Sequence, residues 1–199
     1  VELQGHGHTA DIKRELRFEY LADDTAALLA HLGIEQADVL GYSLGGSVAL
    51  YLALQHPGLV RKLALASTCY TLDGYYPEIR EGLKQATPEG FPPALREAYE
   101  RVAPDPKGWP TLVAKLAQQA ASPGGLRPED IQAITVPALV LVANGDIIRP
   151  EHAEDLARLL HADLMVIPNS DHASYLAEPS EVLLEHLRAF LDAPFLPAR

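Results

Sequence analysis

The sequence predicts an α/β fold with a mostly parallel sheet and helices on both of its faces. Short, continuous apolar runs at 37–42, 62–67, 138–143 and 163–167 alternate with longer segments of helical spacing. Continuous apolar runs are typical of strands buried on both faces, as in parallel sheets, and their alternation with helices indicates the α/β class. A chain of 199 residues with 48% hydrophobic content is long enough to bury one such core.

The N-terminal part predicts a strand end, a loop and a helix in turn. Residues 1–3 look like the end of a strand, and a loop rich in glycine and histidine follows at 5–8. Apolar side chains at helical spacing predict a helix over 18–32. Gly33 follows at once and is a typical helix stop.

A strand, a helix and a second strand are expected next. The apolar run 37–42 predicts a buried strand, and the segment 44–55, rich in Leu, Ala and Val, predicts a helix. Pro57 ends this helix because the residue before a proline is pushed out of helical geometry. The apolar run 62–67 predicts the second buried strand.

The segment 69–131 differs from the rest of the chain. It contains many prolines, most of the aromatic residues and short helical patterns at 94–102 and 110–121. We therefore expect a helical lid over 69–131, inserted into a core formed by 1–68 and 132–199.

The C-terminal part returns to alternating strands and helices. The run 138–143 is the strongest strand pattern in the chain, and a helix is expected over 151–160. A last strand at 163–167 precedes an amphipathic helix over 178–192, whose apolar side chains share one face.

Charge and cysteine content exclude several classes of partner. The formal charge is -11, which repels phosphate backbones and anionic membranes, so we expect neither nucleic acid nor membrane as a partner. The single cysteine, Cys69, can form no internal disulfide and no cysteine-based metal site. Two histidines in the loop at 5–8 do not make a metal site either, and we expect no metal and no cofactor. A cytoplasmic location is expected, with a signal peptide left open because the N-terminus looks cut.

The motif GYSLGG at 41–46 contains the pattern G-x-S-x-G between a predicted strand and a predicted helix. A serine on such a sharp turn is exposed at the carboxyl end of the sheet, and neighbouring glycines remove clashes around it. We interpret Ser43 as a nucleophile, and the amide of Leu44, at a helix N-terminus, as a donor to an oxyanion. The alternative is a glycine-rich turn that only joins strand to helix.

A serine needs a base, and the base needs a carboxylate. His172 lies in the loop after the last predicted strand, at the same sheet end as Ser43. Asp146 follows the strand 138–143 and is the preferred partner of His172, although it could instead cap a turn. Asp171 is a rival, but adjacent residues rarely direct their side chains at each other in an extended loop.

The chain resembles the α/β-hydrolase family, and most closely its lid-bearing single-domain esterases, with haloperoxidase-like and C–C hydrolase-like members. The resemblance spans almost the whole chain and rests on GHG at 5–7, GYSLGG at 41–46, HP at 56–57, NGD at 144–146, RPEH at 149–152 and DH at 171–172. It implies a triad of Ser43, Asp146 and His172, with Leu44 supplying one oxyanion-hole amide.

The chain departs from this family at its N-terminus. Members begin with a segment that carries the first three strands, most of the fourth and a second oxyanion-hole amide, and its third strand lies beside the strand equivalent to 37–42. An unsatisfied strand edge is a liability. We therefore expect the absent strands to come from a segment outside this sequence, another chain or a swapped homo-oligomer.

Aromatic residues suggest where a substrate binds. The candidate pocket residues lie next to the predicted site or in the lid: Tyr42, Cys69, Tyr70, Tyr75, Tyr76 and Trp109, with Phe91 and Tyr99 also in the lid. Apolar pockets lined by aromatic rings suit acyl or aryl groups. The alternative is that these rings form the lid's own small core.

The expected function is hydrolysis of a small, mostly apolar carboxylic ester through an acyl-enzyme. Ser43 attacks, His172 transfers the proton and Asp146 holds His172. The alternatives are C–C bond hydrolysis or perhydrolysis on the same triad, and a non-catalytic ligand receptor with the same fold.

Overall fold

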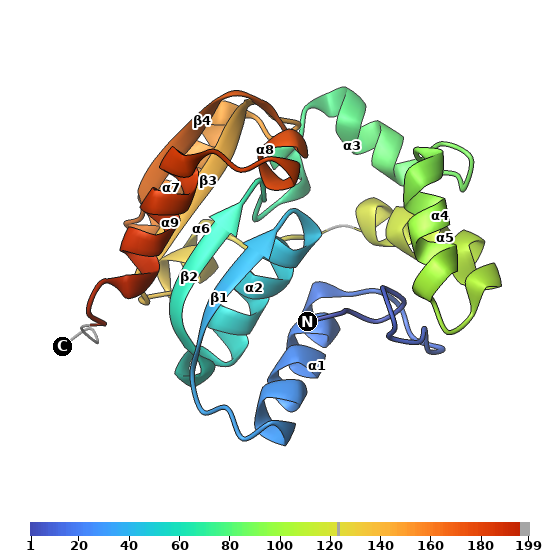
Figure 1. Cartoon of the computed structure of the whole chain (residues 1–199), viewed down its shortest axis with the longest axis horizontal. Helices are drawn as coiled ribbons and strands as arrows, with labels where there is room; N and C mark the ends of the chain where they lie inside the picture. Colours follow the sequence, from blue (N-terminus) through green and yellow to red (C-terminus); the bar gives the residue numbers. More distant parts are fainter. Residues whose placement is uncertain (123, 196–199) are drawn as a thin grey trace.

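A parallel sheet forms the centre of the computed structural model, which describes residues 1–122 and 124–195 (Figure 1). Within these residues the sheet has four strands in the order β1-β2-β3-β4, and each neighbouring pair is parallel. The strands are β1 (Ala37–Tyr42), β2 (Val60–Ala66), β3 (Ala138–Gly145) and β4 (Asp163–Asp171). This confirms the predicted α/β class.

Helices cover both faces of the sheet. Side chains of β2 and β3 alternate between two clusters, with Leu63 and Val140 in one and Leu139 and Leu141 in the other. The larger cluster packs against α1 (Phe18–His31), α2 (Leu44–Gln55), α6 (Pro128–Gln132) and α7 (Pro150–Leu160). The smaller cluster packs against α8 (Ser174–Ala177) and α9 (Glu181–Asp192). Both faces of the inner strands are therefore buried, as their continuous apolar runs predict.

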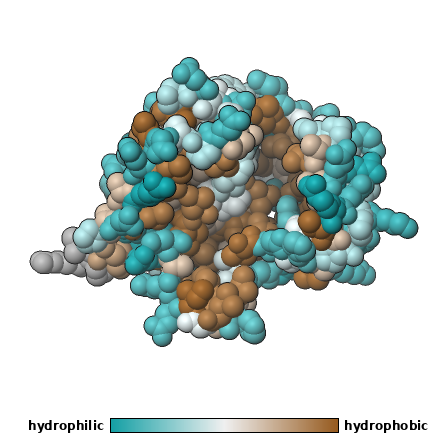
Figure 2. All heavy atoms as spheres, in the orientation of Figure 1, coloured by the Kyte–Doolittle hydropathy of each residue, from teal (hydrophilic) through white to brown (hydrophobic). Residues whose placement is uncertain are grey.

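The outer edge of β1 differs from the buried strands. Leu40 of β1 is 47% exposed, and Leu28 and Ile34 are also exposed nearby in the chain. Figure 2 shows apolar surface on the side of the molecule where β1 and α1 lie. The described residues place no strand against this edge, and the expected further strands beside 37–42 stay a prediction.

Most of the helices between β2 and β3 form a separate group beside the sheet (Figure 1), whereas α6 packs on the sheet. The helices of the separate group are η2 (Leu72–Gly74), α3 (Pro77–Lys84), α4 (Pro93–Val102), η3 (Pro106–Gly108) and α5 (Trp109–Ala121). The helices expected over 94–102 and 110–121 are present as α4 and α5, whereas α3 was not expected. Proline stands in the first turn of all three α-helices, where its missing N–H costs no hydrogen bond.

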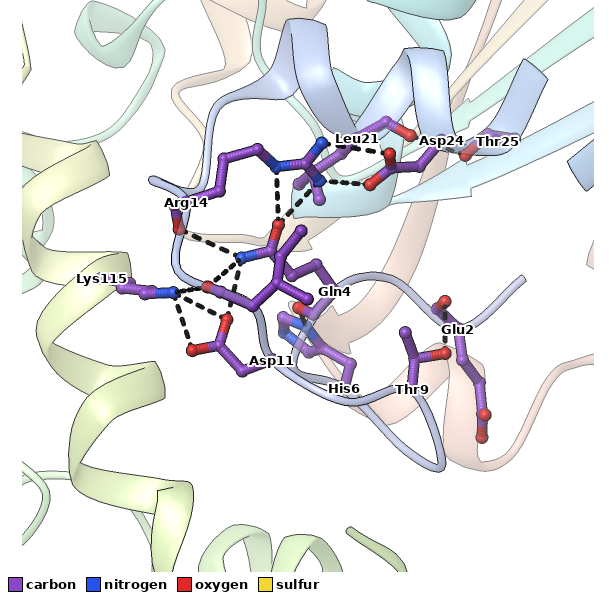
Figure 3. Close-up of polar contacts among 11 residues, drawn as sticks. Glu2, Gln4, His6, Thr9, Asp11, Arg14, Leu21, Asp24, Thr25 and Lys115 are labelled. Atoms are coloured by element: carbon purple, nitrogen blue, oxygen red, sulfur yellow. Dashed lines mark hydrogen bonds and ion pairs between the residues drawn. The ribbon is translucent and has the colours of Figure 1, made fainter. Parts of the chain in front are cut away.

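The opening loop is irregular, so the strand end expected at residues 1–3 is wrong. Gln4, only 4% exposed, organises this loop instead (Figure 3). Its amide nitrogen donates to Asp11 Oδ1 (2.8 Å) and to the Arg14 carbonyl (3.1 Å), and its amide oxygen accepts from the Arg14 guanidinium. Lys115 of α5 donates to both oxygens of Asp11, each at 2.7 Å, and so ties the inserted helices to this loop.

The helices within the described residues include none with both the length and the hydropathy that crossing a bilayer requires.

Candidate active site

Ser43 stands on a strained turn between β1 and α2. Its backbone has φ 51 and ψ -120, a region that non-glycine residues rarely adopt. The turn is held because Ser43 N–H donates to the Ala66 carbonyl (2.9 Å), and Thr68 Oγ1 donates to the Ser43 carbonyl (2.8 Å). A Cβ on Gly41 would lie 2.5 Å from the Gly45 carbonyl oxygen, so this turn requires glycine there.

His172 lies within hydrogen-bond distance of both Ser43 and Asp146. Its Nε2 is 3.1 Å from Ser43 Oγ, and its Nδ1 is 2.8 Å from Asp146 Oδ1. With the proton on Nδ1, the ring donates to Asp146 and leaves Nε2 free to accept from the serine hydroxyl. Tyr42 holds the backbone of this loop, because its hydroxyl donates to the His172 carbonyl (2.8 Å).

Asp146 is a buried carboxylate with four hydrogen-bond donors. Oδ1 accepts from His172 and from Ile148 N–H (3.3 Å), and Oδ2 accepts from Ser67 Oγ and from Ala143 N–H (3.2 Å). Burial alone would raise the pKa of Asp146, but the hydrogen bonds from His172 and Ser67 outweigh it and lower the pKa below its ordinary value. The carboxylate therefore stays ionised at neutral pH.

The rival carboxylate, Asp171, has a different role in the structure. Its Oδ1 accepts from Ala173 N–H (3.0 Å) and Ser174 N–H (2.9 Å), and these backbone hydrogen bonds lower its pKa. Asp171 thus caps the turn that begins α8, and among the contacts of the described residues it makes none with the ring of His172. The carboxylate that contacts this ring is Asp146.

The Leu44 amide stands at the first position of α2, directly after Ser43. Among the hydrogen bonds of the described residues, none uses this N–H as a donor. A free amide at a helix N-terminus, beside a serine hydroxyl, can donate to a negatively charged oxygen.

A cavity of about 440 Å³ opens beside Ser43, between the core and the inserted helices. Three of the expected pocket residues, Cys69, Tyr70 and Tyr75, line this cavity together with Ser43 and Leu44, and so does Phe91. Figure 2 shows a hollow with apolar surface between these two parts of the molecule. The cavity volume lies in the range of about 300–1,000 Å³ that is typical of small-molecule sites.

Three other expected pocket residues lie outside the lining of this cavity, so their contact with a substrate stays a prediction. Tyr42 packs its ring against His172, with ring centres 5.1 Å apart. Trp109 is 6% exposed, donates to the Pro88 carbonyl (3.1 Å) and packs its ring against Phe91 and Tyr99 of the inserted segment. Tyr76 is 36% exposed, because it stands at the start of α3 with its side chain turned to the surface.

Several residues at the site were not expected from the sequence. Leu16 and Phe18 line the cavity from the segment before and in α1, and Leu116 lines it from α5. Ser67 donates to Asp146 from the end of β2. No motif marks these four residues in the sequence; their position near the segment 41–46 follows only from the folded topology.

Two titratable residues beside the cavity are held neutral. Burial raises the pKa of Cys69 to about 12, so the thiol is a poor nucleophile at neutral pH. Burial, together with the nearby Arg149 charge, lowers the pKa of His152 to about 4, and its Nε2 accepts from Tyr70 N–H (3.2 Å). In the part of the chain that the structure describes, no three His, Cys, Asp or Glu side chains gather as metal ligands.

Comparison with known proteins identifies the family. Residues 1–185 match the model described as the alpha/beta hydrolase family. The parallel sheet, the serine turn after β1 and the inserted helices after β2 agree with this match. The chain belongs to the alpha/beta hydrolase family.

Individual relatives include hydrolases and esterases. The chain is 28% identical to the AB hydrolase superfamily protein YisY of Bacillus subtilis, over 92% of this chain and 76% of that protein. It is 30% identical to a pimeloyl-[acyl-carrier protein] methyl ester esterase of Neisseria meningitidis serogroup B, over 96% of this chain and 81% of that protein. A solved structure of a thermophilic esterase from Thermogutta terrifontis is similar with a TM-score of 0.71 and 25% identity, over 94% of this chain and 78% of that chain.

Proposed function

We propose that the protein is a serine hydrolase that cleaves small, mostly apolar carboxylic esters through an acyl-enzyme. The observation that carries this proposal is the unbroken series of contacts from Ser43 Oγ through His172 to the buried carboxylate of Asp146, beside an apolar cavity. The esterase relatives in the same family support an ester as the substrate.

The first half of the proposed reaction forms the acyl-enzyme. Ser43 Oγ attacks the ester carbonyl carbon while its proton passes to His172 Nε2. The carbonyl oxygen takes the negative charge and accepts from the Leu44 N–H. When the carbonyl re-forms, the bond to the alcohol oxygen breaks, and the leaving alkoxide takes the proton from His172.

The second half releases the acid. A water molecule gives a proton to His172 Nε2 and attacks the acyl carbon, and the bond to Ser43 Oγ then breaks as the serine recovers that proton. Asp146 stays ionised throughout and stabilises the imidazolium in both halves. Its four hydrogen bonds and lowered pKa suit this task, because the carboxylate does not compete for the transferred proton.

The cavity limits the substrate class. Its walls combine aliphatic and aromatic side chains with few charged ones, and its volume is about 440 Å³. Such a site favours short acyl or aryl chains, because the hydrophobic contribution grows with the apolar area that the ligand buries. The inserted helices carry one wall, so we propose that the segment 69–131 acts as a lid over Ser43.

The test combines covalent labelling with turnover. A fluorophosphonate should label the wild-type protein at Ser43, and short p-nitrophenyl esters should be hydrolysed with an early burst of p-nitrophenol. Ser43→Ala should lose both, whereas Ser180→Ala, which removes only the hydroxyl that caps α9, should keep both. A folded wild-type protein that neither labels nor hydrolyses any ester would refute the proposal and favour a non-catalytic receptor.

The same assay separates the other reactions of this triad. Turnover of a vinylogous diketone in preference to p-nitrophenyl esters would favour C–C bond hydrolysis. Peroxide-dependent formation of a peracid from a simple ester or acid would favour perhydrolysis. Loss of each activity in Ser43→Ala would show that the same serine carries it.

A further inference from the structure

Ser67 occupies the same position on β2 as the three site residues occupy on their own strands. Each is the first residue after its strand: Ser43 after β1, Ser67 after β2, Asp146 after β3 and His172 after β4. Because the strands are parallel, all four side chains lie at one edge of the sheet. Ser67 is fully buried and has a positive φ of 47.

Ser67 connects the carboxylate of Asp146 to a buried tyrosine. Its Oγ lies within hydrogen-bond distance of Asp146 Oδ2, and 2.6 Å from the hydroxyl of Tyr175, which is 2% exposed. An ionised carboxylate can only accept, so the single Ser67 hydroxyl proton must be donated to Asp146. The Tyr175 hydroxyl therefore donates to Ser67 Oγ, and the order of donation is Tyr175 to Ser67 to Asp146.

Tyr175 also contacts a residue that holds the loop of His172. Tyr175 belongs to α8, three residues after His172, and its ring packs edge-on against Tyr42 at 6.5 Å between ring centres. Tyr42 in turn donates to the His172 carbonyl. The pair Tyr175 and Ser67 thus fixes the orientation of Asp146 and the start of the loop after β4 at the same time.

We propose that Ser67 and Tyr175 are positioning residues of the hydrolase reaction. Their hydrogen bonds orient the Asp146 carboxylate, which in turn holds the His172 ring toward Ser43, and they reduce how strongly this carboxylate stabilises the imidazolium. This inference rests on the proposed function. Neither residue lines the cavity beside Ser43, so both act through Asp146.

A positioning role for Ser67 should change the pH profile and kcat, which a merely structural role would leave unchanged. Without the Ser67 hydroxyl, Asp146 Oδ2 keeps only the Ala143 N–H as a donor, so the carboxylate stabilises the His172 imidazolium more strongly. The acidic limb of the pH profile of kcat/KM should then move to higher pH. Looser orientation of the imidazole should lower kcat by about tenfold and leave KM unchanged. Losses of this order are typical when a group that hydrogen-bonds a functional side chain, such as a metal ligand, is removed.

The experiment compares Ser67→Ala and Tyr175→Phe with the double variant. Each single variant should lower kcat and shift the acidic limb, and Tyr175→Phe should have little further effect in the Ser67→Ala background because both act on one carboxylate. Thr25→Val is the matched control. It removes another buried hydroxyl, which donates to the Leu21 carbonyl of α1 away from the site, and should leave kcat and the pH profile unchanged.

The outcomes separate this inference from the proposed function. A folded Ser67→Ala variant with an unchanged kcat and pH profile would overturn the positioning role of Ser67. The hydrolase assignment would still stand in that case if Ser43→Ala were inactive and Asp146→Asn were impaired. Full activity of Ser43→Ala would overturn the hydrolase assignment itself. If Ser67→Ala fails to fold, Tyr175→Phe, which keeps the buried ring, gives the deciding pH profile.

Discussion

The ion pair between Lys115 and Asp11 should hold the wall of the cavity beside Ser43 in place. Lys115 lies on α5, which lines the cavity through Leu116, and Asp11 belongs to the opening loop that leads to Leu16, which also lines the cavity. Both carboxylate oxygens of Asp11 accept from Lys115 Nζ at 2.7 Å, and the Ile12 carbonyl accepts from it at 2.6 Å. Disrupting this pair should loosen the inserted helices from the loop.

The partial burial of Lys115 and Asp11 determines the expected size of their coupling free energy. The side chains of Lys115 and Asp11 are 16% and 27% exposed, so water screens the pair less than a surface pair. We expect a coupling of about 1–2 kcal/mol, between the value for exposed pairs and the cost of breaking a buried one. For a domain of this size, losing about 1–2 kcal/mol of stability corresponds to a fall in Tm of about 2–8 °C.

The assay is a double-mutant cycle with Lys115→Met and Asp11→Asn, measured by urea unfolding. Arg96 and Glu100, an exposed pair four residues apart on α4, provide the matched control, for which the same cycle should give at most about 0.5 kcal/mol. If the proposed function holds, Lys115→Met should also raise KM for a p-nitrophenyl ester with little change in kcat.

The pH dependence of this coupling has a defined sign. Burial raises the pKa of Asp11, but hydrogen bonds from Lys115 and Gln4 outweigh it, so the pKa of the folded protein lies below the ordinary 3.8. A carboxylate with a lowered pKa stabilises the folded state above its ordinary pKa, and this contribution is lost as the pH falls through the folded value. The coupling should therefore be constant near neutral pH and decline in acid. A coupling no larger than that of the Arg96 control, or one that persists after Asp11 is protonated, would refute this reasoning.

Two further predictions concern the stability of the fold, one beside Ser43 and one at the amino end of β2. Gly46→Ala should destabilise the protein by about 1–3 kcal/mol in urea unfolding, because its Cβ would lie 2.5 Å from Thr68 Cβ in a packed region. Gly45→Ala, whose Cβ would meet nothing within 4 Å, should stabilise α2 by about 0.5–1 kcal/mol. Equal changes in the free energy of unfolding for the two glycine variants would contradict the close packing at Gly46. Lys62, 2% exposed, donates to three carbonyls at the end of α9, so Lys62→Met should cost about 2–4 kcal/mol. The exposed Lys13→Met should change stability by less than about 0.5 kcal/mol, and a similar loss in both would count against the Lys62 contacts.

The strands could be predicted because their apolar runs have few other interpretations. The runs at 37–42, 62–67 and 138–143 correspond to β1, β2 and β3 within a few residues. β4 was predicted to end at residue 167, but it continues to Asp171. Pro168 argues against this extension in the sequence, because proline is rare inside central strands; among the described strands β4 stands at one end of the sheet order, where proline is tolerated.

The inserted segment was harder to predict from sequence. The helix α3 has only Ile79 and Leu83 as large apolar side chains and no buried residue, so it lacks a continuous apolar stripe. Aromatic content likewise does not reveal which way a ring points: Tyr75 lines the cavity, whereas the buried ring of Trp109 packs against Phe91 and Tyr99. Sequence pattern indicates that a ring is present, but only packing decides what it faces.

The extension of β4 explains how residues on opposite edges of the sheet come together. The order of the strand ends across the sheet is Ser43, Ser67, Asp146 and His172, so Ser43 and His172, whose side chains lie 3.1 Å apart, follow the two outermost of the described strands. His172 can reach Ser43 only if its loop passes over the ends of β3 and β2. β4 makes this possible by continuing beyond residue 167, with Asp171 pairing with Gly145 after a shift in register. Tyr42 from β1 and Ser67 from β2 then hold the returning loop, through the His172 carbonyl and through Tyr175. A shortened β4 should therefore separate the imidazole from the serine hydroxyl even if every strand pair and every site residue were kept.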